Sequence, residues 1–240
     1  EKLFNIIGLI LKIRSLIMSI RPNTIVGFLP LPSIIMTIST LGIRCKKIIS
    51  IRNNPNYINI SFLWKILYKF SFNFYDTIVV QTSELKFFYK KKYLNKQIIN
   101  IPNIYNNNLL LRKKKIINPP KKKFILAVGK INSQKGFDLL LEAYNKIQKK
   151  IPRIKLFILS NSNNIDQKYY NYLKNFIKKN NLKNKVKFHF DVSNISDWYR
   201  NSSVYVLSSR YEGYPNSICE AKQNNAFILS FNCKYGPKEI

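Results

Sequence analysis

Short runs of β-branched and apolar residues alternate with longer helix-forming segments along most of the 240-residue chain. Strands that are separated by helices pair in parallel, and the helices then cover the faces of the sheet. In the first half we expect strands at 24–29, 47–51, 77–80 and 97–101, and helices near 33–41, 60–72 and 83–93. This alternation predicts an α/β fold and excludes all-helical and all-β architectures.

The alternation stops between Asn106 and Lys123, where a polar segment contains Pro119-Pro120 and runs of asparagine and lysine. It then resumes, with strands expected at 124–128, 155–159, 186–190, 204–207 and 227–231 and helices at 137–149, 166–180, 195–200 and 216–224. A polar break between two strand–helix series is typical of a linker. We therefore predict two Rossmann-like lobes, residues 1–115 and 116–240.

Composition excludes two classes of protein. Hydrophobic residues make up 46% of the chain, which is too much apolar material for an intrinsically disordered protein. The three cysteines are Cys45, Cys219 and Cys233, and no two are close in sequence, so a disulfide scaffold is also excluded. We expect free thiols in a reducing compartment, which agrees with a cytoplasmic location.

The chain is strongly basic, with 41 Lys and Arg against 11 Asp and Glu and a net charge of +30. One interpretation is a general compositional bias, because lysine, asparagine and isoleucine are frequent everywhere. The other is a surface selected for anions, such as phosphorylated substrates, anionic lipid or nucleic acid. No helix-turn-helix, zinc-finger or RNP-like motif is present, so we expect no nucleic-acid partner, and a basic nucleic-acid-binding protein remains the alternative.

Two apolar stretches raise the question of a membrane. Residues 22–43 carry no charge, but three prolines interrupt them, and a strand, a loop and a buried helix explain them better than a membrane span. Residues 4–20 are apolar apart from Lys12 and Arg14. They predict either an ordinary packed helix or a basic amphipathic helix that contacts an anionic membrane from the cytoplasmic side.

Two glutamates form the strongest chemical signal. Glu212 follows the end of the predicted strand 204–207, and Glu220 comes after seven intervening residues, on the first turns of the next helix. Gly213 permits a sharp turn between them, and Asn216 or Ser217 is expected to cap that helix. Ligands of parallel α/β sheets bind at the carboxyl ends of the strands. Ionised carboxylates there suit sugar and ribose hydroxyls, and a helix N-terminus suits a phosphate.

A second loop carries two cations. Lys130 and Lys135 follow the strand 124–128, between Gly129 and the helix 137–149. We expect both amino groups at the same carboxyl edge as Glu212, where they could neutralise a diphosphate leaving group. A solvated loop in a lysine-rich chain is the alternative interpretation of this segment alone.

Together these motifs resemble glycosyltransferase family 4, whose members are retaining enzymes with the GT-B fold that use nucleotide-sugars. The family's glycine–cation loop is matched by Gly129-Lys130-Ile131 with Lys135-Gly136, and its two spaced glutamates by Glu212 and Glu220. Looser matches are Arg21-Pro22-Asn23, Ile51–Pro55, Gln81-Thr82-Ser83, Ile101-Pro102-Asn103 and Phe231–Ile240.

The resemblance implies roles for individual residues. Lys130 and Lys135 would hold the donor diphosphate, Glu212 the transferred sugar, and Glu220 the nucleotide ribose. Backbone groups of Gly213, Tyr214, Asn216 and Ser217 would approach the phosphates. Of these residues, Glu212, Lys135 and Lys130 would act in catalysis. No metal or cofactor is implied; a UDP- or GDP-linked sugar is the substrate, and a glycan or lipid-linked molecule of polysaccharide or lipopolysaccharide synthesis is the acceptor.

The chain also departs from the family pattern. Ser160-Asn161, Phe190, Asn225 and Phe227 replace residues that are commonly glycine or proline in the family. The glycine-rich acceptor-side loop and the last strand–helix units have no counterpart, so we expect a fragment with an incomplete N-terminal lobe and a nearly complete C-terminal lobe. An inactive relic of a glycosyltransferase is a further alternative.

Overall fold

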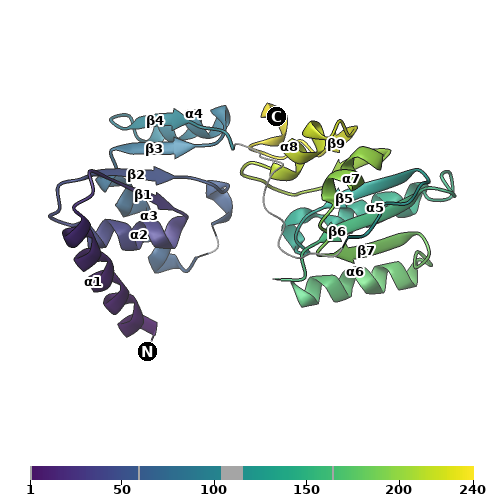
Figure 1. Cartoon of the computed structure of the whole chain (residues 1–240), viewed down its shortest axis with the longest axis horizontal. Helices are drawn as coiled ribbons and strands as arrows, with labels where there is room; N and C mark the ends of the chain where they lie inside the picture. Colours follow the sequence, from purple (N-terminus) through teal and green to yellow (C-terminus); the bar gives the residue numbers. More distant parts are fainter. Residues whose placement is uncertain (1, 59, 104–115, 164) are drawn as a thin grey trace. The chain divides into compact units, whose positions relative to one another are not determined.

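The computed structural model describes residues 2–58, 60–103, 116–163 and 165–240, and the chain divides into two compact units, Glu1–Asn103 and Ile104–Lys238 (Figure 1). Each unit contains one parallel sheet. The predicted lobe boundary between residues 115 and 116 borders residues 104–115, which lie outside the described residues, so that boundary stays a prediction.

The first unit is built on four parallel strands in the order β1-β2-β3-β4. The strands are β1 (Thr24–Phe28), β2 (Lys46–Ser50), β3 (Thr77–Val80) and β4 (Gln97–Asn100). The helices are α1 (Lys2–Ile20), α2 (Pro30–Ser39), α3 (Phe62–Ser71) and α4 (Ser83–Lys92), with short 3₁₀ helices η1 (Pro55–Tyr57) and η2 (Phe72–Phe74). Every predicted element of this half is present, with ends shifted by at most a few residues.

Helix α1 contacts the rest of the first unit through few side chains. Arg14 donates hydrogen bonds to the backbone carbonyls of Ser39 (3.2 Å) and Leu41 (2.7 Å), and Ile17 is buried. Other apolar side chains of α1, such as Leu11 and Met18, are more than half exposed. The expectation of a packed helix is therefore met on one side of α1 only. Among the described residues, no helix combines the length and apolar character needed to cross a bilayer.

The second unit is built on five parallel strands in the order β7-β6-β5-β8-β9. The strands are β5 (Phe124–Val128), β6 (Lys155–Ser160), β7 (Val186–Phe190), β8 (Val204–Leu207) and β9 (Ile228–Ser230). The helices are α5 (Phe137–Ile147), α6 (Gln167–Lys179), α7 (Ile195–Asn201) and α8 (Asn216–Gln223), with 3₁₀ helices η3 (Ser133–Lys135) and η4 (Pro237–Glu239). All nine predicted elements of this half are present, and the fold is the expected Rossmann-like one.

The core of the second unit has two halves, because neighbouring residues of a strand point to opposite faces of a sheet. Ala127 of β5 and Ile158 of β6 pack with α5 and α6 on one face, whereas Leu126 and Phe157 pack with α7 and α8 on the other. The result is a sheet covered by helices on both faces, as Figure 1 shows. All these strands expose their carboxyl ends at one edge, where the candidate site lies.

Candidate active site

The candidate site lies where the strand order of the second sheet reverses. The chain leaves β5 towards β6 and β7 on one side, whereas β8 and β9 lie on the other side of β5. Such a reversal opens a crevice at the carboxyl ends of the two adjacent strands, and ligands of open α/β sheets bind there. The loop after β5 contains Lys130 and Lys135, and the loop after β8 contains Glu212.

Gly136 lets these two loops approach each other. Its φ of +62° lies in the left-handed region, and a Cβ atom at this position would lie only 2.1 Å from the carbonyl oxygen of Ser208. Just before it, the side chain of Asn132 accepts a hydrogen bond from the amide of Lys135 (3.3 Å) and shapes the η3 turn. The glycine of the Lys135-Gly136 pair is therefore required by backbone geometry.

Three further hydrogen bonds hold the two loops together. The Ser208 hydroxyl donates to the carbonyl oxygen of Lys135 (2.9 Å), the Arg210 amide donates to the carbonyl of Gln134 (2.8 Å), and the Gln134 side chain donates to the carbonyl of Tyr211 (3.1 Å). These contacts fix the backbone on both sides of the predicted cations and carboxylates.

Lys135 and Glu212 form an ion pair at the centre of the site. The Lys135 Nζ lies 2.6 Å from Glu212 Oε1, and the two side chains are only 16% and 6% exposed. Gly129 contributes to this contact, because a Cβ there would lie 3.1 Å from the aliphatic stem of Lys135. The motif residues Gly129, Lys135 and Glu212 are thus brought together, although the two loops are far apart in sequence.

Glu220 lies on α8 and is held by an aromatic residue of α7. The Tyr199 hydroxyl donates a hydrogen bond of 2.9 Å to Glu220 Oε2. Burial raises the pKa of the Glu220 carboxyl, and the Tyr199 hydrogen bond and the positive charge of Lys135 offset part of that rise. The influence of Lys135 on both glutamates places these three charged groups in one cluster.

Lys130 takes a different position from Lys135. It is exposed and lines a pocket of about 240 Å³ together with Gly129 and Glu220. Ser160, Asn161 and Asp191, at the carboxyl ends of β6 and β7, line the same pocket. The two lysines therefore follow the same strand, but Lys135 is paired with an acid, whereas Lys130 forms no ion pair among the described residues.

The segment between the two glutamates departs from the sequence expectation in two ways. Gly213 is buried and does not have a positive φ. The glycine with a positive φ next to this segment is Gly236, with φ +91°, and a Cβ atom there would collide with Pro215 and lie close to the carbonyl oxygen of Gly213. The residue at the N-cap of α8 is Pro215, with no side-chain cap, so the expected cap by Asn216 or Ser217 is wrong. Proline has no side-chain oxygen, so the first amides of α8 receive no hydrogen bond from the N-cap side chain.

The remaining predicted contacts of this segment involve Tyr214, Asn216 and Ser217. Tyr214 and Ser217 are half-buried, and Asn216 is exposed at the start of α8. The Ser217 hydroxyl is buried and has no hydrogen-bond partner of normal geometry within the described part of the chain. Tyr214 lies in the loop after β8, and Asn216 and Ser217 lie on the first turn of α8; their role in phosphate binding stays a prediction.

The sequence analysis missed an ion pair beside the site. The Arg210 guanidinium binds both carboxylate oxygens of Asp138 at 2.5 and 2.8 Å, and the Tyr169 hydroxyl donates to the same carboxylate at 2.6 Å. Burial alone would raise the pKa of Asp138, but the hydrogen bonds from Arg210 and Tyr169 outweigh it and lower the pKa to about 2. The charge of Arg210, two residues before Glu212, is a sequence signal for this pair, which anchors α5 to the loop after β8.

We expect the Asp138 carboxylate to stabilise the second unit above pH 4 and to lose that effect as the pH falls from about 4 to about 2, because its folded-state pKa is depressed. Asp138→Asn should lower the free energy of unfolding by about 2 kcal/mol at neutral pH and flatten its pH dependence below pH 4. Denaturant unfolding at several pH values measures both effects. The exposed Asp197–Arg200 pair provides the control, and Asp197→Asn should cost less than about 1 kcal/mol. Equal losses in the two variants would contradict a special role for Asp138.

In the described part of the chain, no three His, Cys, Asp or Glu side chains gather in a way that could hold a metal ion. The charged groups that the sequence predicted for the site are two cations and two carboxylates, and Asp191 lines the pocket beside Lys130 and Glu220. An arrangement of this kind can bind an anion at Lys130 and Lys135 and can accept hydrogen bonds from hydroxyl groups at Glu212 and Glu220.

Known proteins are similar to this chain in fold and in sequence. The structure of HepE from Anabaena, determined in complex with UDP and glucose, aligns with a TM-score of 0.78 at 14% sequence identity, over 96% of this chain and 64% of HepE. A glycosyltransferase of Methanocaldococcus jannaschii is 30% identical over 209 residues, which is 81% of this chain and 50% of that protein. The amylovoran biosynthesis glycosyltransferase AmsD of Erwinia amylovora is 34% identical over 116 residues, 48% of this chain and 31% of AmsD.

The fold is that of the GT-B glycosyltransferases. Residues 111–240 match the family described as Glycosyl transferases group 1, and the chain belongs to that family. The resemblance that the motifs suggested is thereby confirmed. The chain spans about half the length of the Methanocaldococcus protein.

Proposed function

We propose that this chain binds a UDP- or GDP-linked sugar in its second unit and takes part in transferring the sugar, with retention of its anomeric configuration, to a glycan or lipid-linked acceptor. The observation that carries the proposal is the cluster of Lys135, Glu212 and Glu220 at the strand-order reversal. Family membership supports the same conclusion. HepE binds UDP and glucose, and AmsD serves amylovoran biosynthesis, which supports a nucleotide-linked donor and a polysaccharide product.

The ion pair between Lys135 and Glu212 suggests how the site would bind a nucleotide-sugar donor. A diphosphate is an anion that Lys135 and the exposed Lys130 can neutralise, and the first turn of α8 adds backbone amides and the positive end of a helix dipole. Glu212, which pairs with Lys135, can accept hydrogen bonds from hydroxyls of the sugar. Glu220, which lines the same pocket as Lys130, is suited to the ribose hydroxyls.

In the transfer step, the acceptor oxygen forms a bond to the anomeric carbon while the bond from that carbon to the diphosphate oxygen breaks. The acceptor's proton passes to an oxygen of the departing diphosphate, on the same face of the sugar. Charge develops on the diphosphate, so fixed cations beside it lower the barrier. Of the two cations, Lys135 is better placed to stabilise this charge. Its ion pair with Glu212 and the hydrogen bond between Ser208 and the Lys135 carbonyl hold it in position.

We expect UDP or GDP to bind without a divalent metal ion. Lys130, Lys135 and the start of α8 supply the positive charge that a metal ion would otherwise provide. Isothermal titration calorimetry of the full chain with each nucleotide, with and without a chelator, measures this. Binding that requires a divalent ion, or no binding of either nucleotide, would contradict the proposed donor site.

Glu212→Gln should separate the sugar from the nucleotide. The substitution keeps the shape of the side chain, so affinity for the bare nucleoside diphosphate should change by less than about threefold, whereas affinity for the nucleotide-sugar should fall about tenfold as charge-assisted hydrogen bonds to the sugar are lost. Competition titrations with UDP and UDP-glucose compare the two. Glu142→Gln, an acid on α5 outside the site, is the control. Equal losses for both ligands would place Glu212 on the nucleotide.

The acceptor and the location are further parts of the proposal. A lipid-linked acceptor would bring the protein to the inner face of the membrane, and the exposed apolar side chains of α1 with Lys12 and Arg14 are compatible with contact to anionic lipid. We expect a cytoplasmic protein with such peripheral contact.

A further inference from the structure

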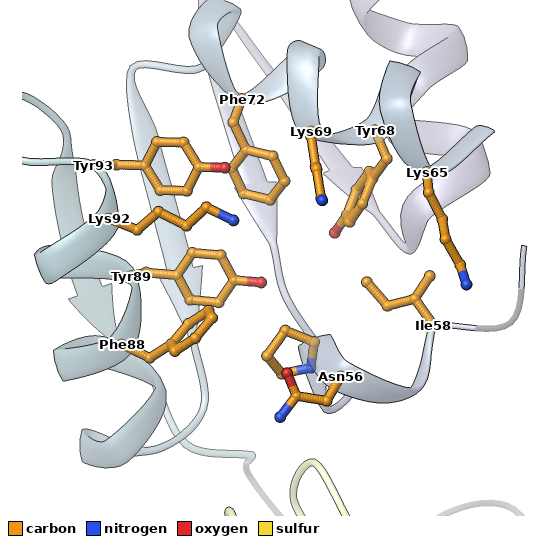
Figure 2. A pocket seen from close by; sticks show the side chains of 11 residues that line it. Asn56, Ile58, Lys65, Tyr68, Lys69, Phe72, Phe88, Tyr89, Lys92 and Tyr93 are labelled. Carbon is orange, nitrogen blue, oxygen red and sulfur yellow. The ribbon is translucent and has the colours of Figure 1, made fainter. Parts of the chain in front are cut away.

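A second pocket lies entirely within the first unit, on the side of its sheet where α3 and α4 pack (Figure 2). Its volume is about 320 Å³. None of the residues proposed for donor binding belongs to it. Its walls are the inner faces of α3 and α4 and the segment around η1, and the lining residues are Pro55, Asn56, Ile58, Lys65, Tyr68, Lys69, Phe72, Phe88, Tyr89, Lys92 and Tyr93.

One wall of the pocket is a stack of three aromatic rings. The rings of Phe72 and Tyr93 are 5.0 Å apart and nearly parallel, at 11°. Tyr89 lies 5.7 Å from Phe72 at 16° and 6.1 Å from Tyr93 at 12°. Two of these side chains come from α4 and the residue after it, and Phe72 comes from the end of α3, so the stack fixes the distance between the helices. The pocket is therefore a preformed feature of this unit.

The Tyr68 hydroxyl is the most informative group in the pocket. The residue as a whole is only 6% exposed, and it lines the pocket. Figure 2 shows the oxygen of Tyr68 directed into the hollow, on the same side as the oxygen of Tyr89. Burial raises the pKa of the Tyr68 phenol, so the group stays protonated and can donate a hydrogen bond. A hydroxyl that faces the pocket can donate to an acceptor oxygen of a molecule bound there.

The charges around this hydroxyl are all positive. The amino groups of Lys69 and Lys92 point into the same hollow, and Lys65 stands at its rim. No Asp or Glu lines the pocket, and these three lysines form no ion pair within the described part of the chain. A concave site with hydrogen-bond donors and uncompensated cations favours an anion with several acceptor oxygens, and a phosphate group has that chemistry.

The surface of α3 next to the pocket lysines carries exposed apolar side chains. Phe62, Ile66 and Phe70 project from α3 at helical spacings next to Lys65 and Lys69, and they are 79%, 49% and 58% exposed. A phosphate in the pocket could therefore carry an organic group that covers these side chains. A lipid headgroup and a soluble phosphate would present the same phosphate chemistry to the pocket itself.

We propose that the pocket between α3 and α4 is a binding site for a phosphate group, held by Lys69, Lys92 and the Tyr68 hydroxyl. The site is separate from the donor site in the second unit and goes beyond the proposed transfer reaction. The phosphate is either that of an anionic lipid or that of a soluble compound, and the two arms of the experiment distinguish these sources.

The test uses the full chain with saturating UDP, which occupies the proposed donor site. The first probe is inorganic pyrophosphate, followed by calorimetry. The second is phosphatidylcholine vesicles with and without phosphatidic acid, followed by co-sedimentation. The variants are Tyr68→Phe, which removes only the hydroxyl, and the double substitution Lys69→Gln with Lys92→Gln. The matched control is Lys90→Gln with Lys91→Gln, which removes the same charge from exposed positions of α4 outside the pocket.

We expect at least one probe to bind, with pyrophosphate indicating a soluble phosphate and phosphatidic acid alone indicating a lipid headgroup. The double pocket variant should lose about tenfold or more in affinity and Tyr68→Phe about fivefold, whereas the control should change by less than about twofold. UDP affinity should be the same in all variants, so a failure of this site is distinct from a failure of the donor site.

Binding of neither probe, an equal loss in the control, or unchanged affinity in a folded Tyr68→Phe protein would overturn the proposal. Circular dichroism establishes folding, and Tyr68→Phe keeps the buried ring if the double variant does not fold.

Discussion

Lys135→Ala is expected to lower the free energy of unfolding of the second unit by about 3 kcal/mol, because it leaves the buried carboxylate of Glu212 without its countercharge. The same substitution should reduce UDP affinity by about 1.5–3 kcal/mol, the value of a hydrogen bond to a charged group. Denaturant unfolding measures the first effect and calorimetry the second.

A double variant separates these two losses. Lys135→Met with Glu212→Gln removes both charges, so most of the lost stability should return, whereas UDP affinity should stay low because the cation is still missing. Lys130→Met is the matched control, since Lys130 is exposed and pairs with no acid among the described residues. It should leave stability unchanged and weaken UDP binding only. Recovery of UDP affinity in the double variant would show that Lys135 acts through structure alone and does not bind the diphosphate.

Gly136→Ala should destabilise the second unit by about 3 kcal/mol or more, from backbone strain at a positive φ together with a collision with backbone. The added Cβ would lie 2.1 Å from the carbonyl oxygen of Ser208, and a backbone atom of a neighbouring strand end cannot rotate away as a side chain can. Because the loops after β5 and β8 would have to separate, UDP binding should be lost as well. Thermal unfolding and calorimetry test the two consequences.

Gly42 offers a control for the conformational part of this cost. It also has a positive φ, +74°, but a Cβ there would meet no atom within 4 Å. Gly42→Ala should therefore cost only about 1 kcal/mol, from the left-handed backbone alone. A similar loss for the two substitutions would mean that the contact between Gly136 and Ser208 is not a constraint on the site.

Comparison of the motifs with the structure shows where local information was sufficient. The strands at Thr77–Val80, Phe124–Val128, Val186–Phe190 and Val204–Leu207 have the predicted limits, because each is a short apolar run bounded by polar or turn-forming residues. The cap of α8 was predicted wrongly, because several residues near a helix start can set the turn and sequence does not say which one does.

The sequence by itself determined the α/β class, the order and approximate limits of the elements, the family, and the two segments that carry Lys130, Lys135, Glu212 and Glu220, since each depends on residues close together in the chain. Only the tertiary structure decided which lysine is paired with an acid. Lys135 and Glu212 are 77 positions apart and meet because β8 pairs with β5. The same holds for the Arg210–Asp138 pair, 72 positions apart, and for the pocket between α3 and α4. Contacts of this kind depend on strand order and helix packing, which are settled by the burial of the whole core and by no single segment of it.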